Sequence, residues 1–203
     1  MHVRDAKDGE ELKNPSPILF QKSIDLINKN GGTVFLVGLK KNKIYNSLNS
    51  IIDTTKLPLD QYERECLSIY IWSKSKFFIG CLSGGSLPPL TFGIKTLWLD
   101  IHPTEFFRTP NVGDICLPKR IFYENEKRYL TFEEANSQFH YISQTENPKL
   151  AKNNGYKIES VTFDLVENIL NNLITGEKDI NPNFKEEHHP RLPIGARIFT
   201  KIL

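Results

Sequence analysis

Short apolar runs alternate with helix-like segments along the first half of the sequence, and this alternation limits the fold more than any other feature. Thr33 to Val37 is a continuous run with β-branched residues, typical of a buried parallel strand, and Thr96 to Leu99 is a second expected strand. Ile18 to Asn30 and Gln61 to Ser75 carry apolar residues on one helical face. We therefore expect an α/β fold: a Rossmann-like parallel sheet with helices on both faces.

The second half of the chain has a less regular pattern. Cys116 to Phe122, together with Arg128 to Leu130, indicates a small β excursion, and Thr131 to Glu134 has the spacing of a capping box that begins a short helix. Asn147 to Gly155 is polar and predicts a loop. Thr162 to Thr175 is the clearest amphipathic helix of the chain.

The expected domain organisation is one α/β domain over residues 1–175 and a C-terminal tail over residues 176–203 that packs back on it. The chain starts abruptly, because Met1 to Asp5 already looks like the end of a strand that runs into a loop. We therefore expect the first strand to be truncated and the natural domain to begin upstream.

Composition excludes several classes of function. The net charge is only +2, so there is no global case for nucleic-acid binding. Cys66, Cys81 and Cys116 form no C-x-x-C pair, so neither a zinc ribbon nor a disulfide framework is indicated. No apolar run approaches the roughly 20 residues of a membrane span, and no signal peptide is recognised at the N-terminus, so a cytoplasmic location is expected.

The stretch from Lys76 to Leu90 reads as strand, tight turn and helix start. Gly84 and Gly85 would let a ligand approach the backbone, and Ser86 is a fitting N-cap. Free N–H groups at a helix start suit a phosphate or another anion. The loop lacks the Walker, G-x-G-x-x-G and G-x-S-x-G patterns, which removes the main support for ATPase, dinucleotide-binding and serine-hydrolase functions. A purely structural turn is the alternative.

His2 and Arg4 lie two residues apart at an expected strand end, so both project to one side. Arginine can clamp a phosphate with two hydrogen bonds, and histidine can donate a hydrogen bond or act as a base. Surface decoration is the alternative for this pair. Ligands of parallel sheets bind outside the carboxyl ends of the strands, where three features are expected: His2–Asp5, Gly80–Ser86 and Asp100–His102.

Metal binding has little support. His102 and the His188-His189 pair have no carboxylate or cysteine partner at a helpful spacing, and loop histidines are usually solvated. We therefore expect neither a metal site nor a cofactor.

Two motifs resemble those of a family of bacterial glycosyltransferases. They are H-V-R-D at His2–Asp5 and F-F-I-G-x-x-S-G-x-S-x-x-P from Phe77 to Pro89, followed by Phe92-Gly93. The pattern over roughly Met1 to His102 is similar to the C-terminal, donor-binding half of GT-B glycosyltransferases. It is also similar to fucosyltransferases, in which an H-x-R motif meets the nucleotide diphosphate.

The resemblance implies roles for particular residues. The catalytic candidates are His2, as a polar partner of donor or acceptor, and Asp5, which would orient Arg4. The residues implied to bind the donor diphosphate without a metal are Arg4, Ser83, Gly84, Gly85 and Ser86. No residue is assigned to the nucleoside.

The function implied is transfer of a sugar from a nucleotide-diphosphate sugar to a glycan or polysaccharide acceptor, as in polysaccharide biosynthesis. In a GT-B enzyme the acceptor binds to an N-terminal domain, which would precede His2 and is the expected missing partner. The alternatives are a non-catalytic truncated remnant or nucleotide-sugar-binding module and, third, an epimerase-like half-domain that binds phosphosugars.

Overall fold

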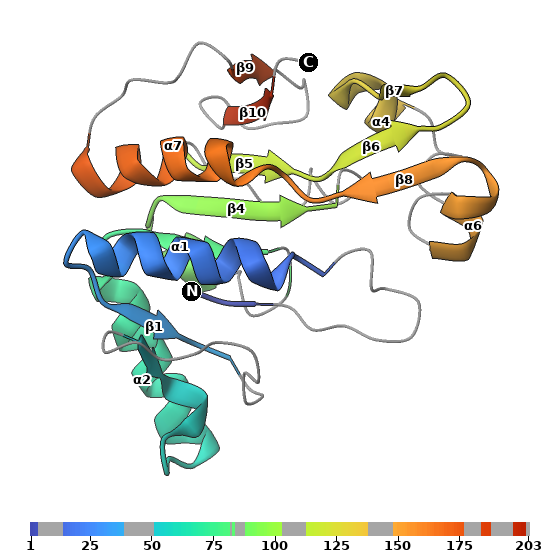
Figure 1. Cartoon of the computed structure of the whole chain (residues 1–203). Coiled ribbons are helices and arrows are strands. Elements are labelled where there is room, and N and C mark those ends of the chain that lie inside the picture. Colours follow the sequence, from blue (N-terminus) through green and yellow to red (C-terminus); the bar gives the residue numbers. More distant parts are fainter. Residues whose placement is uncertain are drawn as a thin grey trace.

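The computed structural model describes residues 1–3, 14–38, 51–81, 83, 88–102, 113–137, 148–176, 184–187 and 197–201 of the chain (Figure 1). Its helices are α1 (Pro17–Lys29), α2 (Gln61–Lys74), α3 (Pro88–Thr91), α4 (Phe132–Ser137), α6 (Pro148–Asn153), α7 (Phe163–Thr175) and the 3-10 helix η2 (Thr54–Lys56). Its strands are β1 (Val34–Leu36), β2 (Ile51–Asp53), β3 (Phe78–Gly80), β4 (Thr96–Ile101), β5 (Ile115–Pro118), β6 (Arg120–Tyr123), β7 (Arg128–Tyr129), β8 (Tyr156–Glu159), β9 (Phe184–Glu187) and β10 (Arg197–Lys201).

A short segment at the start of the chain joins two groups of strands. β1 pairs with β2, and β3, β4 and β5 pair in order, with every one of these pairs parallel. The Met1–Val3 segment lies between β1 and β3. The His2 N–H donates to the Ile79 carbonyl oxygen at 3.0 Å on one side, and the Val37 N–H donates to the Met1 carbonyl oxygen at 3.0 Å on the other. His2 and Gly80 form a parallel bridge, so the strand direction is kept.

The order across this part of the sheet is β2, β1, Met1–Val3, β3, β4, β5. Numbered along the chain, these six segments follow the order 3-2-1-4-5-6, which is that of the Rossmann arrangement. The expected parallel α/β sheet is therefore confirmed. β10 extends the sheet in parallel beside β5, and β9 pairs antiparallel with β10 at the edge.

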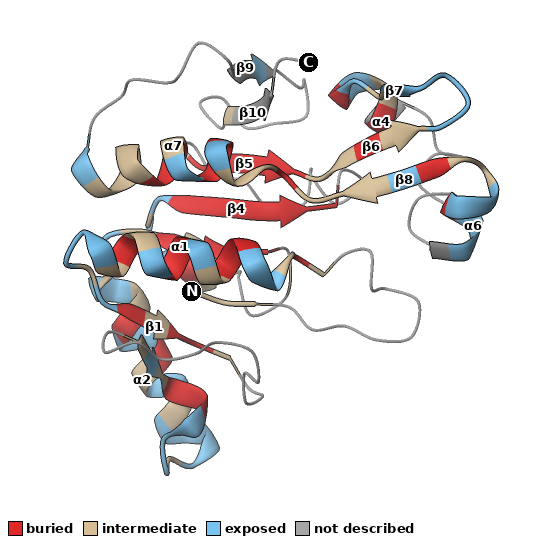
Figure 2. Cartoon of the chain, viewed as in Figure 1, coloured by how far each residue is buried: buried red, intermediate tan, exposed pale blue. Residues whose placement is uncertain are grey.

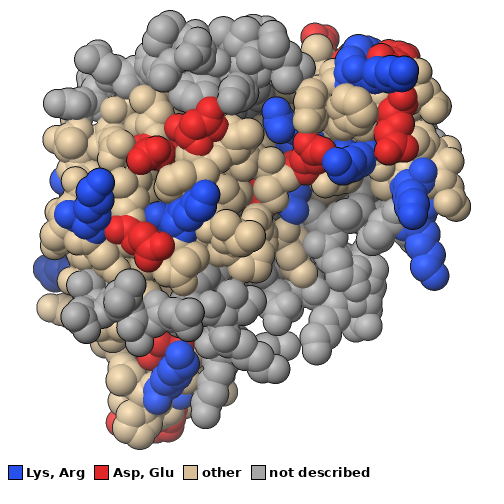
Figure 3. Space-filling model, viewed as in Figure 1, with Lys and Arg blue, Asp and Glu red and all other residues tan. Residues whose placement is uncertain are grey.

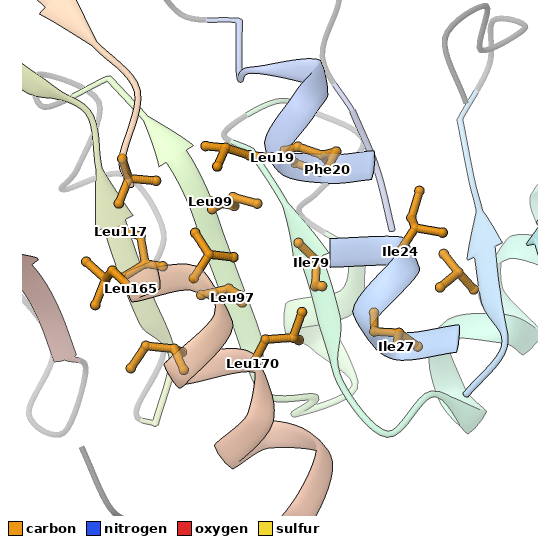
Figure 4. Packing of buried hydrophobic residues seen from close by; sticks show 14 of the residues in the cluster. Leu19, Phe20, Ile24, Ile27, Ile79, Leu97, Leu99, Leu117, Leu165 and Leu170 are labelled. Atoms are coloured by element: carbon orange, nitrogen blue, oxygen red, sulfur yellow. The ribbon is translucent and has the colours of Figure 1, made fainter. Parts of the chain in front are cut away.

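Alternate residues of the central strands face two layers of helices. On one face, α1 and α7 pack side by side over Ile79, Leu97 and Leu99 (Figure 4). On the other face, Ile71 of α2 packs against Val37 and Phe78. All of β4 is buried (Figure 2), as expected for a strand covered on both sides. Burial of each leucine in this core contributes about 1.5–3 kcal/mol.

Two predicted helix signals are confirmed. α7 occupies the predicted amphipathic segment, and Gly176 ends it with a left-handed φ of 85°. The capping box at Thr131 is formed: the Glu134 N–H donates to the Thr131 hydroxyl at 3.1 Å, and the Thr131 N–H donates to the Glu134 carboxylate at 2.7 Å. α4 begins directly after Thr131, and Glu134 lies in its first turn.

The predicted β excursion is partly wrong. Cys116–Pro118, the first part of the predicted run, is not part of it, because these residues belong to β5, which pairs with β4 in the main sheet. The excursion itself exists as a small antiparallel sheet in the order β7, β6, β8. The run from Ile115 to Pro118 is short, and periodicity alone does not distinguish a strand buried on both faces from one in a small satellite sheet.

The loop predicted over Asn147–Gly155 is also wrong where the structure describes it. Pro148–Asn153 forms α6, and β8 follows at Tyr156. α6 buries Ala151, while Lys149 and Leu150 are exposed. This short polar helix therefore has almost no apolar face, and the sequence shows no amphipathic pattern that would predict it.

Candidate functional site

The structure describes two of the predicted site residues. His2 lies in the central Met1–Val3 segment, and Ser83 lies three residues beyond the end of β3. The Met1–Val3 segment and β3 are neighbours and run parallel, so Val3 and Gly80 both lie at the carboxyl edge of the sheet. The remaining predicted residues lie outside the described ones: Arg4, Asp5, Gly84, Gly85 and Ser86.

This edge is the topological switch point of the sheet. From the Met1–Val3 segment the chain proceeds through α1 to β1 on one side, whereas β3 on the other side continues toward β4. Connections leaving in opposite directions open a crevice at the carboxyl ends of the two strands, which is where ligands of such sheets bind. His2 is thus at the position that the topology favours for a ligand.

Among the described residues, one backbone group holds the His2 ring. Its Nδ1 lies 3.1 Å from the carbonyl oxygen of Val37, the residue that follows β1. A carbonyl only accepts hydrogen bonds, so Nδ1 carries the proton and donates, and in the neutral ring Nε2 is left as an acceptor. Burial lowers the pKa of His2, while the hydrogen bond to Val37 opposes that change. At neutral pH the imidazole is uncharged.

Gly38 lies beside this ring. A Cβ built there would make ordinary contacts, 3.5 Å from His2 Nδ1 and 4.0 Å from the Thr55 Cγ2, so it is the φ of +156°, and not a lack of space, that favours glycine. The sequence places this glycine directly after the apolar Thr33–Val37 run. Its neighbour in space was not predictable, because that required the strand order.

The third predicted feature, the end of β4, has a different role. Asp100 is fully buried, and its φ of 55° is left-handed. Its Oδ2 accepts from the Ser16 N–H at 2.7 Å and the Ser160 hydroxyl at 2.9 Å, and its Oδ1 accepts from the Val161 N–H at 3.0 Å. The ammonium of Lys119 is 3.7 Å from Oδ2. These contacts give the Asp100 carboxylate a structural role, because they connect the end of β4 to other parts of the fold.

The contacts of Asp100 explain why the carboxylate is tolerated in the interior. Ser16 and Thr162 are the N-caps of α1 and α7, and neither side chain caps its helix. Asp100 therefore brings a negative charge to the start of both helices, where their dipoles favour it. Lys119 adds a second link, since its Nζ also donates to the Asn14 carbonyl oxygen at 2.6 Å.

Another buried carboxylate lies at the opposite edge of the sheet. Asp114 accepts from the Thr96 N–H at 3.1 Å and from the Trp98 indole N–H at 3.0 Å. Together with burial, its charge raises the pKa of Cys116 well above the usual value. Trp98 stands in an apolar pattern that predicts a core residue, which its burial confirms, and nothing in the sequence indicated Asp114 as the partner of its N–H.

A pocket of about 490 Å³ lies near the amino ends of the strands, away from the switch point. The ends of α1 and α2 form much of its wall, and its lining includes Thr33, Tyr70, Lys74, Phe77 and Ile174. Most of the lining is apolar. Because it is at the opposite edge from His2, it is not part of the predicted donor site.

No group of three potential metal-ligating side chains is found among the described residues, and His188 and His189 lie outside them. On the face drawn in Figure 3, acidic and basic side chains are interspersed over the described part of the chain rather than gathered in one basic patch. None of the described helices is long and apolar enough to cross a bilayer. No protein-family model, curated protein or solved structure matches the chain.

Proposed function

We propose that this chain is the donor-binding part of a GT-B-type glycosyltransferase that works in the cytoplasm. It would transfer a sugar from a nucleotide-diphosphate sugar to a glycan or polysaccharide acceptor. One observation supports this most directly: His2 and Val3 of the H-V-R-D motif lie in the segment that runs parallel beside β3, and Ser83, the first residue of S-G-x-S, lies three residues beyond the end of β3. Two motifs suited to an anion thus start from adjacent points on the edge where a ligand is expected.

The chemistry of the two motifs is complementary to a diphosphate. An arginine can give a phosphate two parallel charge-assisted hydrogen bonds, which is the proposed role of Arg4, oriented by Asp5. Ser83–Ser86 would supply hydroxyl and backbone donors to the same phosphates. As the bond from sugar to phosphate breaks, negative charge grows on the leaving diphosphate, and donors fixed in advance would stabilise it without a metal.

The tautomer of His2 gives it a defined part in this proposal. With Nδ1–H held by Val37, Nε2 can accept a hydrogen bond from a sugar hydroxyl of the donor or acceptor. The lowered pKa keeps that lone pair available at neutral pH. If the hydroxyl is the attacking one, His2 takes its proton as a general base.

Calorimetry with UDP, GDP, CMP and dTDP tests the donor site. We expect one of these nucleotides to bind, and Arg4→Ala to weaken binding by about 10- to 150-fold, the loss of about 1.5–3 kcal/mol typical of hydrogen bonds to a charged group. Lys29→Ala removes an exposed cation at the end of α1 and serves as the matched control. No binding at millimolar concentration, or equal effects of the two variants, would contradict the proposal.

A turnover assay then distinguishes an enzyme from a module that only binds nucleotide sugars. The matching nucleotide sugar is incubated with and without a panel of glycan acceptors, and products are analysed by mass spectrometry. Acceptor-dependent transfer that His2→Gln slows supports the glycosyltransferase. Donor binding without product in every mixture supports a nucleotide-sugar-binding module, and a changed sugar without any acceptor supports an epimerase-like activity.

A further inference from the structure

Helix α2 presents an apolar surface that nothing in the described chain covers. Tyr62, Ile69 and Tyr70 are 75%, 49% and 62% exposed, and Cys66 is exposed between them. Residues spaced by three, four and seven positions fall on one side of a helix. These four side chains therefore form a stripe along α2, which we name the α2 stripe.

The rest of α2 already has its core contacts. Ile71 and Ser68 are buried, and Leu67 and Trp72 pack beside Ile71 in the cluster under the sheet. The helix is thus apolar on two sides, whereas a helix on the surface of a monomer usually keeps one side polar. α2 lies at the periphery of the molecule, with much of its length exposed (Figures 1 and 2). A second apolar side at such a position indicates a protein interface.

The charges beside the stripe indicate what covers it. Glu63 lies in the first turn of α2 and Lys74 in the last turn. They are eleven residues apart, about three helical turns or roughly 16 Å, so both lie on the same flank of the stripe. A second α2 running antiparallel would bring its Lys74 to Glu63 and its Glu63 to Lys74. A parallel copy related by a two-fold axis would place the two Glu63 side chains, and likewise the two Lys74 side chains, on opposite sides of the seam, so these charges would not pair.

We propose that the α2 stripe is a self-association surface on which two copies of this chain pair through antiparallel α2 helices around a two-fold axis. Such an interface is self-complementary, as two-fold symmetry requires. The apolar stripe forms its centre, and two Glu63–Lys74 ion pairs flank it. Tyr70 and Lys74 also line the pocket of about 490 Å³, so the partner helix lies beside its mouth.

The size of the surface sets the expected affinity. α2 has 14 residues, which is about 21 Å of helix. One pair of such helices buries less than the roughly 1,600 Å² of a standard interface, so the dimer is weak and depends on concentration. We expect a dissociation constant in the micromolar range.

Sedimentation velocity on the full chain at about 1 to 200 µM tests this association. Ile69→Ser is expected to weaken dimerisation at least tenfold, while Ile18→Ser, which changes an exposed isoleucine on α1, leaves it unaltered. Lys74→Glu is expected to weaken it several-fold, while Lys29→Glu, in the last turn of α1, does not. Thermal melts of each variant confirm that it is folded.

Cross-linking tests whether the two α2 helices face each other. In the proposed pair the two Cys66 residues are offset by about 8 Å along the helices, within reach of bis(maleimido)ethane. Cys81 and Cys116 are buried, so Cys66 is the residue that reacts in the folded chain. A cross-linked dimer that Cys66→Ser abolishes supports the proposal. A monomer at every concentration, or a dimer unchanged by Ile69→Ser, overturns it.

Discussion

The Oδ2 atom of Asp100 lies 2.7 Å from the backbone nitrogen of Ser16, and this hydrogen bond joins the end of β4 to the start of α1. The same carboxylate also bonds Val161, ahead of α7. The two helices that cover one face of the sheet are therefore both fixed to one buried side chain.

Asp100→Ala is expected to destabilise the fold by at least about 3 kcal/mol, because it leaves the N–H groups of Ser16 and Val161 without their acceptor and removes the buried negative charge beside Lys119. Urea unfolding followed by tryptophan fluorescence measures the change. Asp25→Ala removes an exposed aspartate on α1 and should change the free energy of unfolding by less than about 0.5 kcal/mol. Similar losses in both variants would show that the buried hydrogen bonds are unimportant.

Asp100→Gly separates the backbone contribution from that of the carboxylate. The φ of 55° at this position costs an alanine about 1–2 kcal/mol but costs glycine almost nothing. Glycine should therefore be less harmful than alanine, yet clearly less stable than aspartate. Unfolding free energies measured side by side give this order, and a glycine variant as stable as the natural protein would contradict it.

The ion pair on the small sheet gives a prediction for acid conditions. Two hydrogen bonds from Arg128, at 2.8 Å each, and one from the Thr131 N–H lower the pKa of Glu134 from 4.5 to about 2. Its contribution to stability is present above pH 4.5 and is lost as the pH falls toward 2. Because the pair is exposed, the contribution is below about 1 kcal/mol.

Glu134→Gln should therefore be less stable than the natural chain at pH 6, and the difference should disappear near pH 2. Denaturant unfolding at several pH values measures this. Glu133→Gln, at the neighbouring position of the same helix, provides the control. A constant difference between Glu134→Gln and the natural chain would argue against the ion pair.

The effect of His2 on stability depends on pH in the opposite direction from that of an ion-paired histidine, whose pKa is raised by folding. Because burial lowers its pKa, the unfolded chain takes up a proton near pH 6.5 before the folded chain does, and stability falls as the pH drops below that value. NMR of the ring nitrogens should show a neutral Nδ1–H tautomer at pH 7 and a titration midpoint below 6.5. A midpoint at or above 6.5, or an Nε2–H tautomer, would remove the basis for its proposed acceptor role.

Thiol labelling distinguishes the three cysteines. At pH 8 one thiol per folded chain should react quickly with a small disulfide reagent, because Cys66 is exposed while Cys81 and Cys116 are buried. The raised pKa of Cys116 lowers its reactivity further. Three thiols should react in denaturant, and Cys66→Ser should remove the fast phase. A second fast phase in the folded protein would show that a buried thiol is accessible.

Local patterns predicted much of the fold. The amphipathic period predicted α7, and the Thr131–Glu134 spacing predicted a helix start. Each of these signals is contained within a short stretch of the sequence, so it can be recognised without knowledge of distant contacts. The strand Val34–Leu36 was evident from the apolar run Thr33–Val37, which includes the β-branched residues Thr33, Val34 and Val37. These elements depend on neighbours in the sequence.

Features that depend on distant contacts were not predictable. The hydrogen-bond donors to Asp100 and Asp114 come from residues far along the chain. The sequence does not show which buried donors will surround these two carboxylates. The candidate site was anticipated in part: His2 and the segment after β3 were predicted at a carboxyl edge, whereas Val37 and Gly38 as neighbours of the His2 ring were not.

The position of the Met1–Val3 segment also has a consequence for how the sheet forms. Its backbone bonds connect it to Val37 on one side and Ile79 on the other, both far along the chain, so two large loops must close before these bonds exist. β1 with β2 and β3 with β4 can pair earlier, since they need shorter closures. We therefore expect insertion of this segment to be a late folding step, after which the two groups of strands unfold as one cooperative unit.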